Sequence, residues 1–200
     1  MQIDIKTLVL LVVVGTISGL VTYQVGKGEM HDIKVEYENK VLKIKDEAEQ
    51  FIDNFSLVLT YIDTARSDLE KGIYYLNLAN FSIEQKSYNK AMDSANKSVF
   101  CFTLSQENFL KALQALSNMS QKTDLINLYI NYTQVALLLT EVGIRLSENI
   151  SMVAMYLMQN LSEQGNSTLS NCVVLNSTFQ DREYILDNCL TEIKNYHKVR

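Results

Sequence analysis

The sequence predicts an all-α protein with a single N-terminal transmembrane helix, a long helical stalk and an up-down bundle of about four helices. Three observations support this fold class: an uncharged apolar stretch near the N-terminus, a sustained heptad pattern after it, and a scarcity of turn residues. The chain has 200 residues, no Pro and only seven Gly, whereas sandwiches and barrels need many turns. Its hydrophobic content of 47% is too high for a disordered chain.

The apolar stretch covers residues 8–25, which contain no charged side chain. At about 1.5 Å per residue these residues form a helix of about 27 Å, close to the hydrocarbon thickness of a bilayer. Tyr23 lies at the far edge, where an aromatic ring favours the membrane interface. The hydrophobic region of a cleaved signal peptide is shorter and ends in small residues of the Ala-x-Ala kind. Here the first Ala is Ala48. We therefore expect a retained signal-anchor in the lipid bilayer, with residues 1–7 as a short cytoplasmic N-terminus.

The side of the membrane follows from candidate sites of N-glycosylation. The motif Asn-x-Ser/Thr occurs nine times, at Asn54, Asn80, Asn96, Asn118, Asn131, Asn149, Asn160, Asn166 and Asn176. Ser and Thr make up 28 of the 200 residues, so the 17 asparagines would give roughly two motifs by chance. All nine follow the apolar stretch, and N-glycosylation takes place outside the cytoplasm. The motifs predict a glycoprotein with an extracytoplasmic C-terminal domain; accidental matches in an Asn-rich chain are the alternative.

Residues 26–53 are predicted to form a hinge and a helical stalk. Gly26 and Gly28 directly follow the membrane segment and weaken the helix there. Apolar residues then recur in steps of three and four, a coiled-coil pattern that predicts one helix from about Met30 to about Glu84. The stripe consists of Val41, Ile44, Ala48, Phe51, Phe55, Val58, Ile62, Ala65, Leu69, Gly72, Leu76 and Ala79. We expect its first part to bind a protein partner or a second copy, and its part from Phe55 onward to pack inside the bundle.

Residues 54–200 are predicted to form the helical bundle. A second helix is expected to start at the N-cap Ser87 and to run to about Asn118. A third helix is expected from Thr123 to about Ser162. At about 100° per residue, the sequon asparagines 131, 149 and 160 fall within roughly 20° of one another on this helix. They are expected to share its solvent-exposed face, which leaves the opposite face free to pack.

The C-terminal part is predicted to begin with a loop at residues 164–176, because this segment is rich in Ser, Asn and Thr. A last helix is expected to start at Ser177, with Gln180 three residues later completing a capping box. It ends in His197, Lys198 and Arg200, and basic residues favour the C-terminal end of a helix.

Two contacts are predicted from cysteines and glycines. Cys172 in the expected loop and Cys189 in the expected last helix are expected to form a disulfide outside the cytoplasm. Such a bridge closes about 18 residues and contributes roughly 3 kcal/mol. Two free thiols, or pairing through Cys101, are the alternatives. Gly15 and Gly19 form a Gly-x-x-x-Gly pair in the membrane segment, which allows two membrane helices to approach closely.

No group of residues indicates catalysis or metal binding. The two histidines, His31 and His197, have neither Glu-x-x-His nor His-Glu-x-x-His spacing, and no Gly-rich phosphate loop is present. The carboxylates between Asp46 and Asp53 are interpreted as a solvated helix face. The chain has 18 basic and 23 acidic residues, a net charge of −5, and no basic cluster for nucleic acid. We expect no enzyme, no cofactor, no metal and no nucleic-acid partner.

The function that the sequence favours is a structural or protein-interaction role at the cell surface or envelope. Two alternatives rest on resemblances of architecture. An anchored four-helix bundle whose first helix leaves the membrane directly resembles the ectodomains of chemoreceptors, which implies a ligand-sensing or accessory ectodomain of a membrane complex. An apolar N-terminal helix that continues into a head domain is similar to pilins, which implies a filament subunit.

Overall fold

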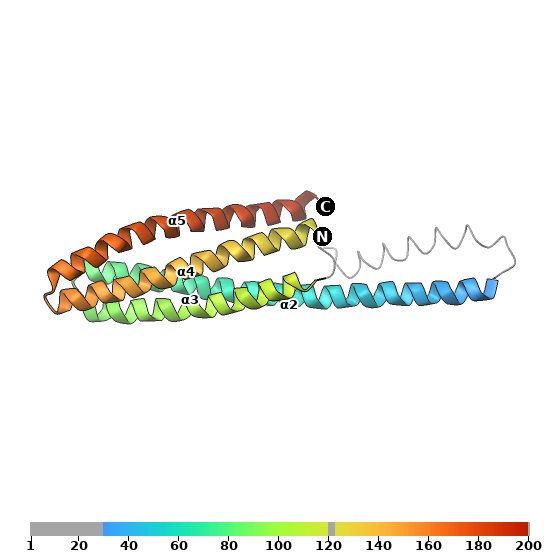
Figure 1. Cartoon of the computed structure of the whole chain (residues 1–200), viewed down its shortest axis with the longest axis horizontal. Helices are drawn as coiled ribbons and strands as arrows, with labels where there is room; N and C mark the ends of the chain where they lie inside the picture. The colour runs from blue at the N-terminus through green and yellow to red at the C-terminus, as the bar shows by residue number, and fades with distance from the viewer. Residues whose placement is uncertain (1–29, 120–122, 200) are drawn as a thin grey trace. The chain divides into compact units, whose positions relative to one another are not determined.

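A computed structural model describes residues 30–119 and 123–199 of the chain (Figure 1). They form four α-helices: α2 (Met30–Glu84), α3 (Tyr88–Ser117), α4 (Asp124–Met158) and α5 (Ser162–Val199). No strand occurs among these residues, which confirms the predicted all-α fold class. None of these four helices is both long and apolar enough to cross a bilayer. The predicted transmembrane segment 8–25, with its two glycines, lies outside the described residues.

The chain divides into two compact units, Met1–Phe55 and Ser56–Arg200. The described part of the first unit is the beginning of α2. Its surface carries three ion pairs between residues four positions apart: Lys40–Glu36, Lys43–Glu47 and Lys45–Glu49. Pairs with this spacing stabilise an exposed helix. The carboxylates of this part are therefore a solvated face, as the heptad phase predicts.

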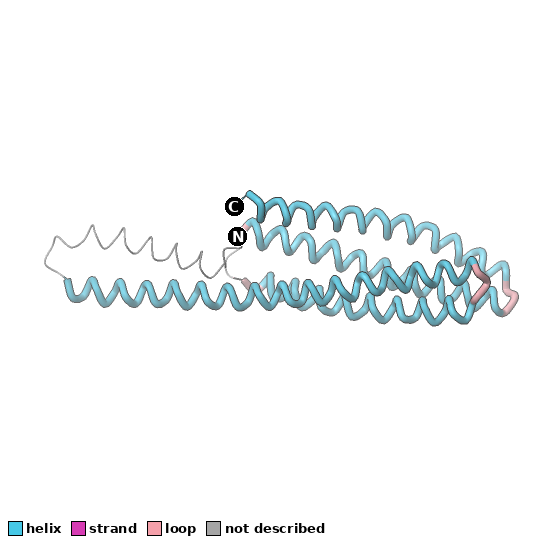
Figure 2. The backbone as a smooth tube through the Cα atoms, turned by 180° about the vertical axis from the view of Figure 1, so that it is seen from behind, coloured by secondary structure: helices cyan, strands magenta, loops and turns pink. Residues whose placement is uncertain are grey.

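The second unit is a bundle of the remaining part of α2 with α3, α4 and α5. The helices are joined by residues 85–87, 118–123 and 159–161, and each helix runs in the direction opposite to that of the helix before it (Figure 2). α3 packs against α4, and α4 packs against α5. Consecutive helices are therefore antiparallel, which is the up-down arrangement that short connections favour.

The apolar stripe of α2 forms its face toward the core. From Phe55 to Ala79 all eight stripe positions are buried: Phe55, Val58, Ile62, Ala65, Leu69, Gly72, Leu76 and Ala79. In the first unit, by contrast, Val41, Ala48 and Phe51 are half-buried and Ile44 is exposed. The predicted helix Met30–Glu84 is present, and its stripe is buried from Phe55 onward, as predicted.

Two of the connections use the same backbone device. Lys86 and Asn160 adopt positive φ angles of 57° and 59°, and each follows the end of a helix. The amide of the next residue then donates to a carbonyl five positions back, from Ser87 to Ser82 at 2.8 Å and from Leu161 to Tyr156 at 2.9 Å. These bonds satisfy carbonyls that the helix end would leave unpaired, as in a Schellman motif. The usual residue here is Gly, which explains why the sequence predicts these ends less sharply.

The N-terminal ends of α3 and α4 lie where the sequence predicts them. Ser87 is the N-cap of α3, although its side chain makes no capping hydrogen bond. Thr123 is the N-cap of α4, and its Oγ1 accepts from the amide of Ile126 at 3.3 Å. α4 ends at Met158, four residues before the expected end.

The prediction for residues 164–176 was wrong, because α5 is continuous from Ser162 to Val199. The expected helix start at Ser177 and its capping box therefore lie inside a helix. Buried residues recur at every seventh position, at Gly165, Cys172, Phe179, Leu186 and Ile193. Packing of this stripe against the bundle overrides the low helix propensity of the Ser, Asn and Thr residues between.

The centre of the bundle is built around the ring of Phe102 on α3. A Cβ atom on Gly72 of α2 would lie 2.8 Å from this ring, and so would a Cβ atom on Gly143 of α4. Phe179 of α5 contacts the same ring edge to face, with ring centroids 5.8 Å apart. The two glycines therefore provide the space into which the ring inserts, and all four helices meet at this level.

Candidate functional site

The nine sequons are spread over α2, α3, α4, α5 and the connections between them. Seven of the asparagines are exposed: Asn54, Asn96, Asn118, Asn131, Asn160, Asn166 and Asn176. Asn80 and Asn149 are half-buried, and no sequon asparagine is buried. A glycan on any of these side chains would leave the bundle through its surface and not through its core.

The hydroxyl residues of three sequons are nevertheless buried: Ser82, Ser98 and Thr133, which follow Asn80, Asn96 and Asn131. Ser82 Oγ donates to the carbonyl of Leu78 at 2.7 Å. Ser98 Oγ donates to the carbonyl of Gly72 at 2.8 Å, across to α2. Because the motif requires this hydroxyl, modification of these three asparagines would have to take place before the bundle folds.

Asn131 and Asn149 lie along one side of α4, as predicted, but Asn160 does not, because α4 ends at Met158. Asn160 lies in the connection to α5, in the left-handed conformation. The carboxamide Nδ2 of Asn131 donates to Sγ of Cys189 on α5 at 3.5 Å. The side of α4 that carries these sequons is therefore the edge beside α5, and it is only partly the solvent-exposed face that the sequence predicts.

The predicted disulfide between Cys172 and Cys189 does not fit the fold. All three cysteines, including Cys101, are buried free thiols. Cys172 and Cys189 lie 17 residues apart on the same helix, which separates them by about 25 Å along its axis. A disulfide needs Cα atoms within about 7 Å. The prediction failed because it depended on the expected loop at residues 164–176. Burial raises the pKa of each thiol.

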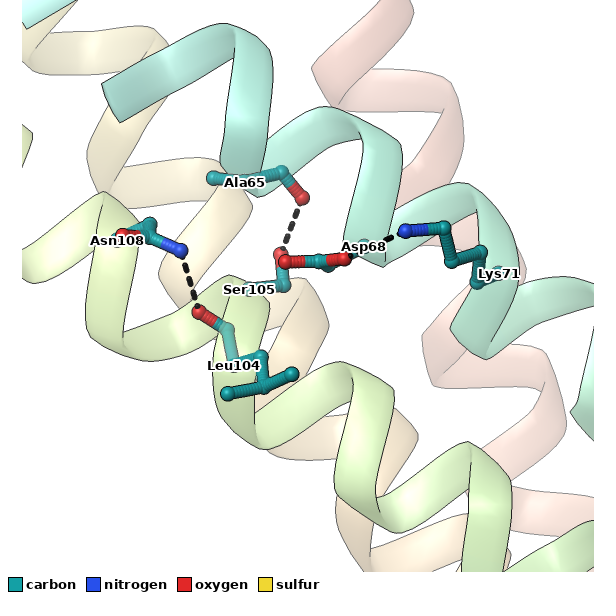
Figure 3. Close-up of polar contacts among 6 residues, drawn as sticks. All are labelled: Ala65, Asp68, Lys71, Leu104, Ser105 and Asn108. Carbon is teal, nitrogen blue, oxygen red and sulfur yellow. Dashed lines mark hydrogen bonds and ion pairs between the residues drawn. The ribbon is translucent and has the colours of Figure 1, made fainter. Parts of the chain in front are cut away.

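Buried hydroxyls tie α3 to its neighbours. Ser105 Oγ donates to the carbonyl of Ala65 on α2 at 2.8 Å, next to the surface ion pair of Lys71 with Asp68 (Figure 3). About two helical turns away on α3, Ser98 Oγ accepts a hydrogen bond from Ser147 Oγ of α4 at 2.9 Å. These bonds run between helices through small side chains, which lets the three helices approach closely. The signal for them in the sequence is a run of small residues on the core-facing side of α3.

One buried polar group stands apart from these pairs. The hydroxyl of Tyr132 on α4 is buried and has no hydrogen-bond partner among the described residues. Its ring contacts Phe109 of α3 edge to face. Desolvation raises the pKa of this phenol, and Arg66 of α2 and Asp187 of α5 act on it from a distance. Sequence reasoning missed this residue, because a tyrosine in an apolar stripe carries no sign that its hydroxyl will lack a partner.

The described residues contain no cluster of metal-ligating side chains. No group of three or more His, Cys, Asp or Glu gathers among them in a way that could hold a metal ion. A surface pocket of about 320 Å³ lies at the connection between α2 and α3 and is lined by Lys86, Ser87, Tyr88, Asn89, Lys90 and Met158. It contains no acidic, histidine or cysteine side chain and lies away from the Phe102 level of the core.

The chain matches no family model, and the comparisons with curated proteins and with solved structures give no match either. The function must therefore be argued from the bundle and its surface.

Proposed function

We propose that the chain is a membrane-anchored, N-glycosylated protein whose extracytoplasmic helical bundle has a structural or protein-interaction role at the cell surface or envelope. Residues 1–7 would be cytoplasmic, residues 8–25 would form the transmembrane helix, and residues 26–53 would form the hinge and stalk. The observation that carries the proposal is the number of sequons, nine where roughly two are expected by chance. None of the nine asparagines is buried, so each could carry a glycan at the surface of the bundle.

The interior of the bundle supports a scaffold role over a binding role. Six of its buried hydroxyls donate to helix carbonyls or to another hydroxyl: Ser82, Ser98, Ser105, Thr133, Thr140 and Ser147. Polar groups that recognise a ligand converge on a cavity, whereas these groups are used in packing. The polar interior therefore favours a rigid support for a surface that other proteins contact.

The stalk supplies a surface for such a contact. Leu42 and Ile44 are more than half exposed on α2, and Val41, Ala48 and Phe51 are half-buried. A heptad stripe of this kind suits parallel association of helices, and the Gly15 and Gly19 pair of the membrane segment suits the same association inside the bilayer. The proposed partner of the stalk is a second copy of the chain.

The location is tested on protein from its native host. We expect an intact mass raised by several glycans, which an N-glycosidase removes, together with a C-terminal domain that external protease digests on whole cells. The N-terminus should survive this treatment, since it would lie on the other side of the membrane. Unmodified asparagines combined with a protease-resistant C-terminal domain would refute the proposal.

The contact between stalks is tested by crosslinking in membranes. Single cysteines introduced as Val41→Cys and Ile44→Cys should give crosslinked dimers. Asp46→Cys is the matched control, because Asp46 points away from the stripe and should crosslink poorly. The unmodified chain, whose three native cysteines are buried, gives the background. Equal crosslinking at positions 44 and 46, or none at any position, would show that the stripe does not join two copies.

A further inference from the structure

We propose that α5 detaches from the bundle as a cooperative unit, with the connection at residues 159–161 as its hinge, while α2, α3 and α4 stay packed. Burial is less complete along α5 than between α3 and α4. Phe102, Phe109 and Leu139, on α3 and α4, are completely buried, whereas the best-buried large side chains of α5, Phe179, Leu186 and Ile193, keep 4%, 5% and 6% exposure. Ile62 and Leu69 of α2 keep 4% and 5%, so the difference between α2 and α5 lies in their hydrogen bonds to the bundle.

The hydrogen bonds between the helices differ in strength. Three buried hydrogen bonds of 2.8–2.9 Å link α2, α3 and α4, from Ser98 to Gly72, from Ser105 to Ala65 and from Ser147 to Ser98. Between α4 and α5, Asn131 Nδ2 donates to a thiol sulfur at 3.5 Å. Sulfur is a weak acceptor. Separating α5 from the bundle therefore breaks weaker hydrogen bonds than separating any of the other three helices.

The hydroxyl of Tyr132 also favours opening. It is buried with no hydrogen-bond partner among residues 30–119 and 123–199, in a position where Asp187 and Cys189 of α5 influence it. A buried polar group that is not hydrogen-bonded destabilises the state in which it is buried. Lifting α5 lets water reach this hydroxyl, which recovers part of the free energy that the opening costs.

The sequence of α5 has a low intrinsic helix propensity. Its first half, from Glu163 to Thr178, contains one Gly and many Ser, Asn and Thr residues, which have low helix propensity. This half is helical because its buried stripe packs, so it loses its support when the stripe leaves the bundle.

The three native cysteines report this motion without any mutation. Cys172 and Cys189 are buried on α5, whereas Cys101 is buried on α3, where Asp68 and Lys71 of α2 influence it. Opening of α5 therefore exposes the first two and leaves the third covered. The full chain in mild detergent is pulsed with iodoacetamide under native conditions. Peptide mass spectrometry then gives the rate at each cysteine, and each rate is divided by the rate in urea-unfolded protein.

We expect Cys172 and Cys189 to react at the same normalised rate, at least roughly tenfold faster than Cys101. Tyr132→Phe removes the unsatisfied hydroxyl and should slow both α5 cysteines roughly tenfold. Tyr75→Phe is the matched control and should change neither rate. Phe179→Leu weakens the contact with Phe102 and should accelerate both α5 cysteines without accelerating Cys101.

Three results would overturn the proposal. Equal rates at all three cysteines would mean that only global unfolding exposes them. A fast Cys172 with a slow Cys189 would mean that the first half of α5 frays alone. Acceleration by Tyr132→Phe would mean that its hydroxyl stabilises the closed bundle. None of these readings depends on glycosylation or on the membrane anchor, so the inference stands or falls independently of the proposed function.

Discussion

The Cβ atom that Gly143 lacks would lie 2.8 Å from Cζ of Phe102. This distance is shorter than a carbon–carbon contact allows, and the neighbouring atom belongs to a rigid ring clamped between two helices. The absence of a side chain at Gly143 is therefore a packing requirement of the bundle, and the same holds for Gly72 on the opposite side of the ring.

Gly143→Ala should destabilise the bundle by roughly 1–3 kcal/mol, because overpacking forces the ring or the helices apart. Gly165→Ala is the matched control. Its Cβ would lie 3.4 Å from the flexible side chain of Leu157, so the gain in helix propensity should stabilise α5 by up to about 1 kcal/mol. Urea unfolding followed by circular dichroism measures both changes. Equal effects of the two substitutions would contradict the clamped position of Phe102.

The positive φ of Lys86 predicts that Gly stabilises the chain at residue 86, although Gly destabilises it inside a helix. Lys86→Gly should stabilise the chain by roughly 0.5–1 kcal/mol, because Gly adopts the left-handed conformation without steric cost. Lys111→Gly, an exposed position inside α3, should destabilise it by about 1 kcal/mol. Thermal unfolding of the two variants separates these outcomes. Destabilisation in both would show that the α2–α3 connection does not hold residue 86 in this conformation.

Alkaline pH should weaken the fold. Burial raises the pKa of Tyr132 above 10.0 and those of Cys101, Cys172 and Cys189 above 9.0. Below about pH 8 these groups are protonated in both states, so their stabilisation is fully present. As the pH rises past 9 and then 10, the unfolded chain releases protons that the folded chain retains. The free energy of unfolding then falls by up to about 1.4 kcal/mol per pH unit for each group.

Urea titrations between pH 7 and 11 measure this decline. Tyr132→Phe should reduce the loss of stability above pH 10, whereas Tyr74→Phe, at an exposed position, should leave the loss unchanged. The same alkaline slope in both variants would show that the phenol of Tyr132 is not buried.

Reducing agents should leave the stability unchanged. Since Cys172 and Cys189 are on one helix and far apart, no bridge between them contributes to folding. The thermal midpoint should be the same with and without dithiothreitol, and non-reducing peptide mapping should find three free thiols. A peptide that joins Cys172 to Cys189 would instead restore the loop that the sequence predicts at residues 164–176.

Periodicity predicted most of the fold, and composition misled where the two signals disagreed. The α2 stripe could be predicted because every core position from Phe55 to Ala79 carries an apolar residue, except Gly72. In α5 the same seven-residue spacing exists, at Cys172, Phe179, Leu186 and Ile193, but Ser and Asn between these positions suggested a loop. Local helix propensity determines whether a segment without tertiary contacts is helical, whereas burial of an apolar stripe determines this for a segment that packs.

The candidate site was predicted unevenly for a related reason. A sequon is read from three adjacent residues, so all nine could be found in the sequence. Whether the hydroxyl of a sequon faces the core depends on the helix phase, and Ser98 and Thr133 proved to be core residues. The missing partner of Tyr132 depends on what three other helices present to it, which no local pattern contains.

The ring of Phe102 also sets a rule for how this sequence can change over time. Gly72, Phe102 and Gly143 lie on three different helices, yet none of them can be replaced by a larger residue unless another is replaced by a smaller one. Homologous chains should therefore vary at these three positions jointly, with a smaller residue in place of the phenylalanine wherever either glycine has been replaced by alanine.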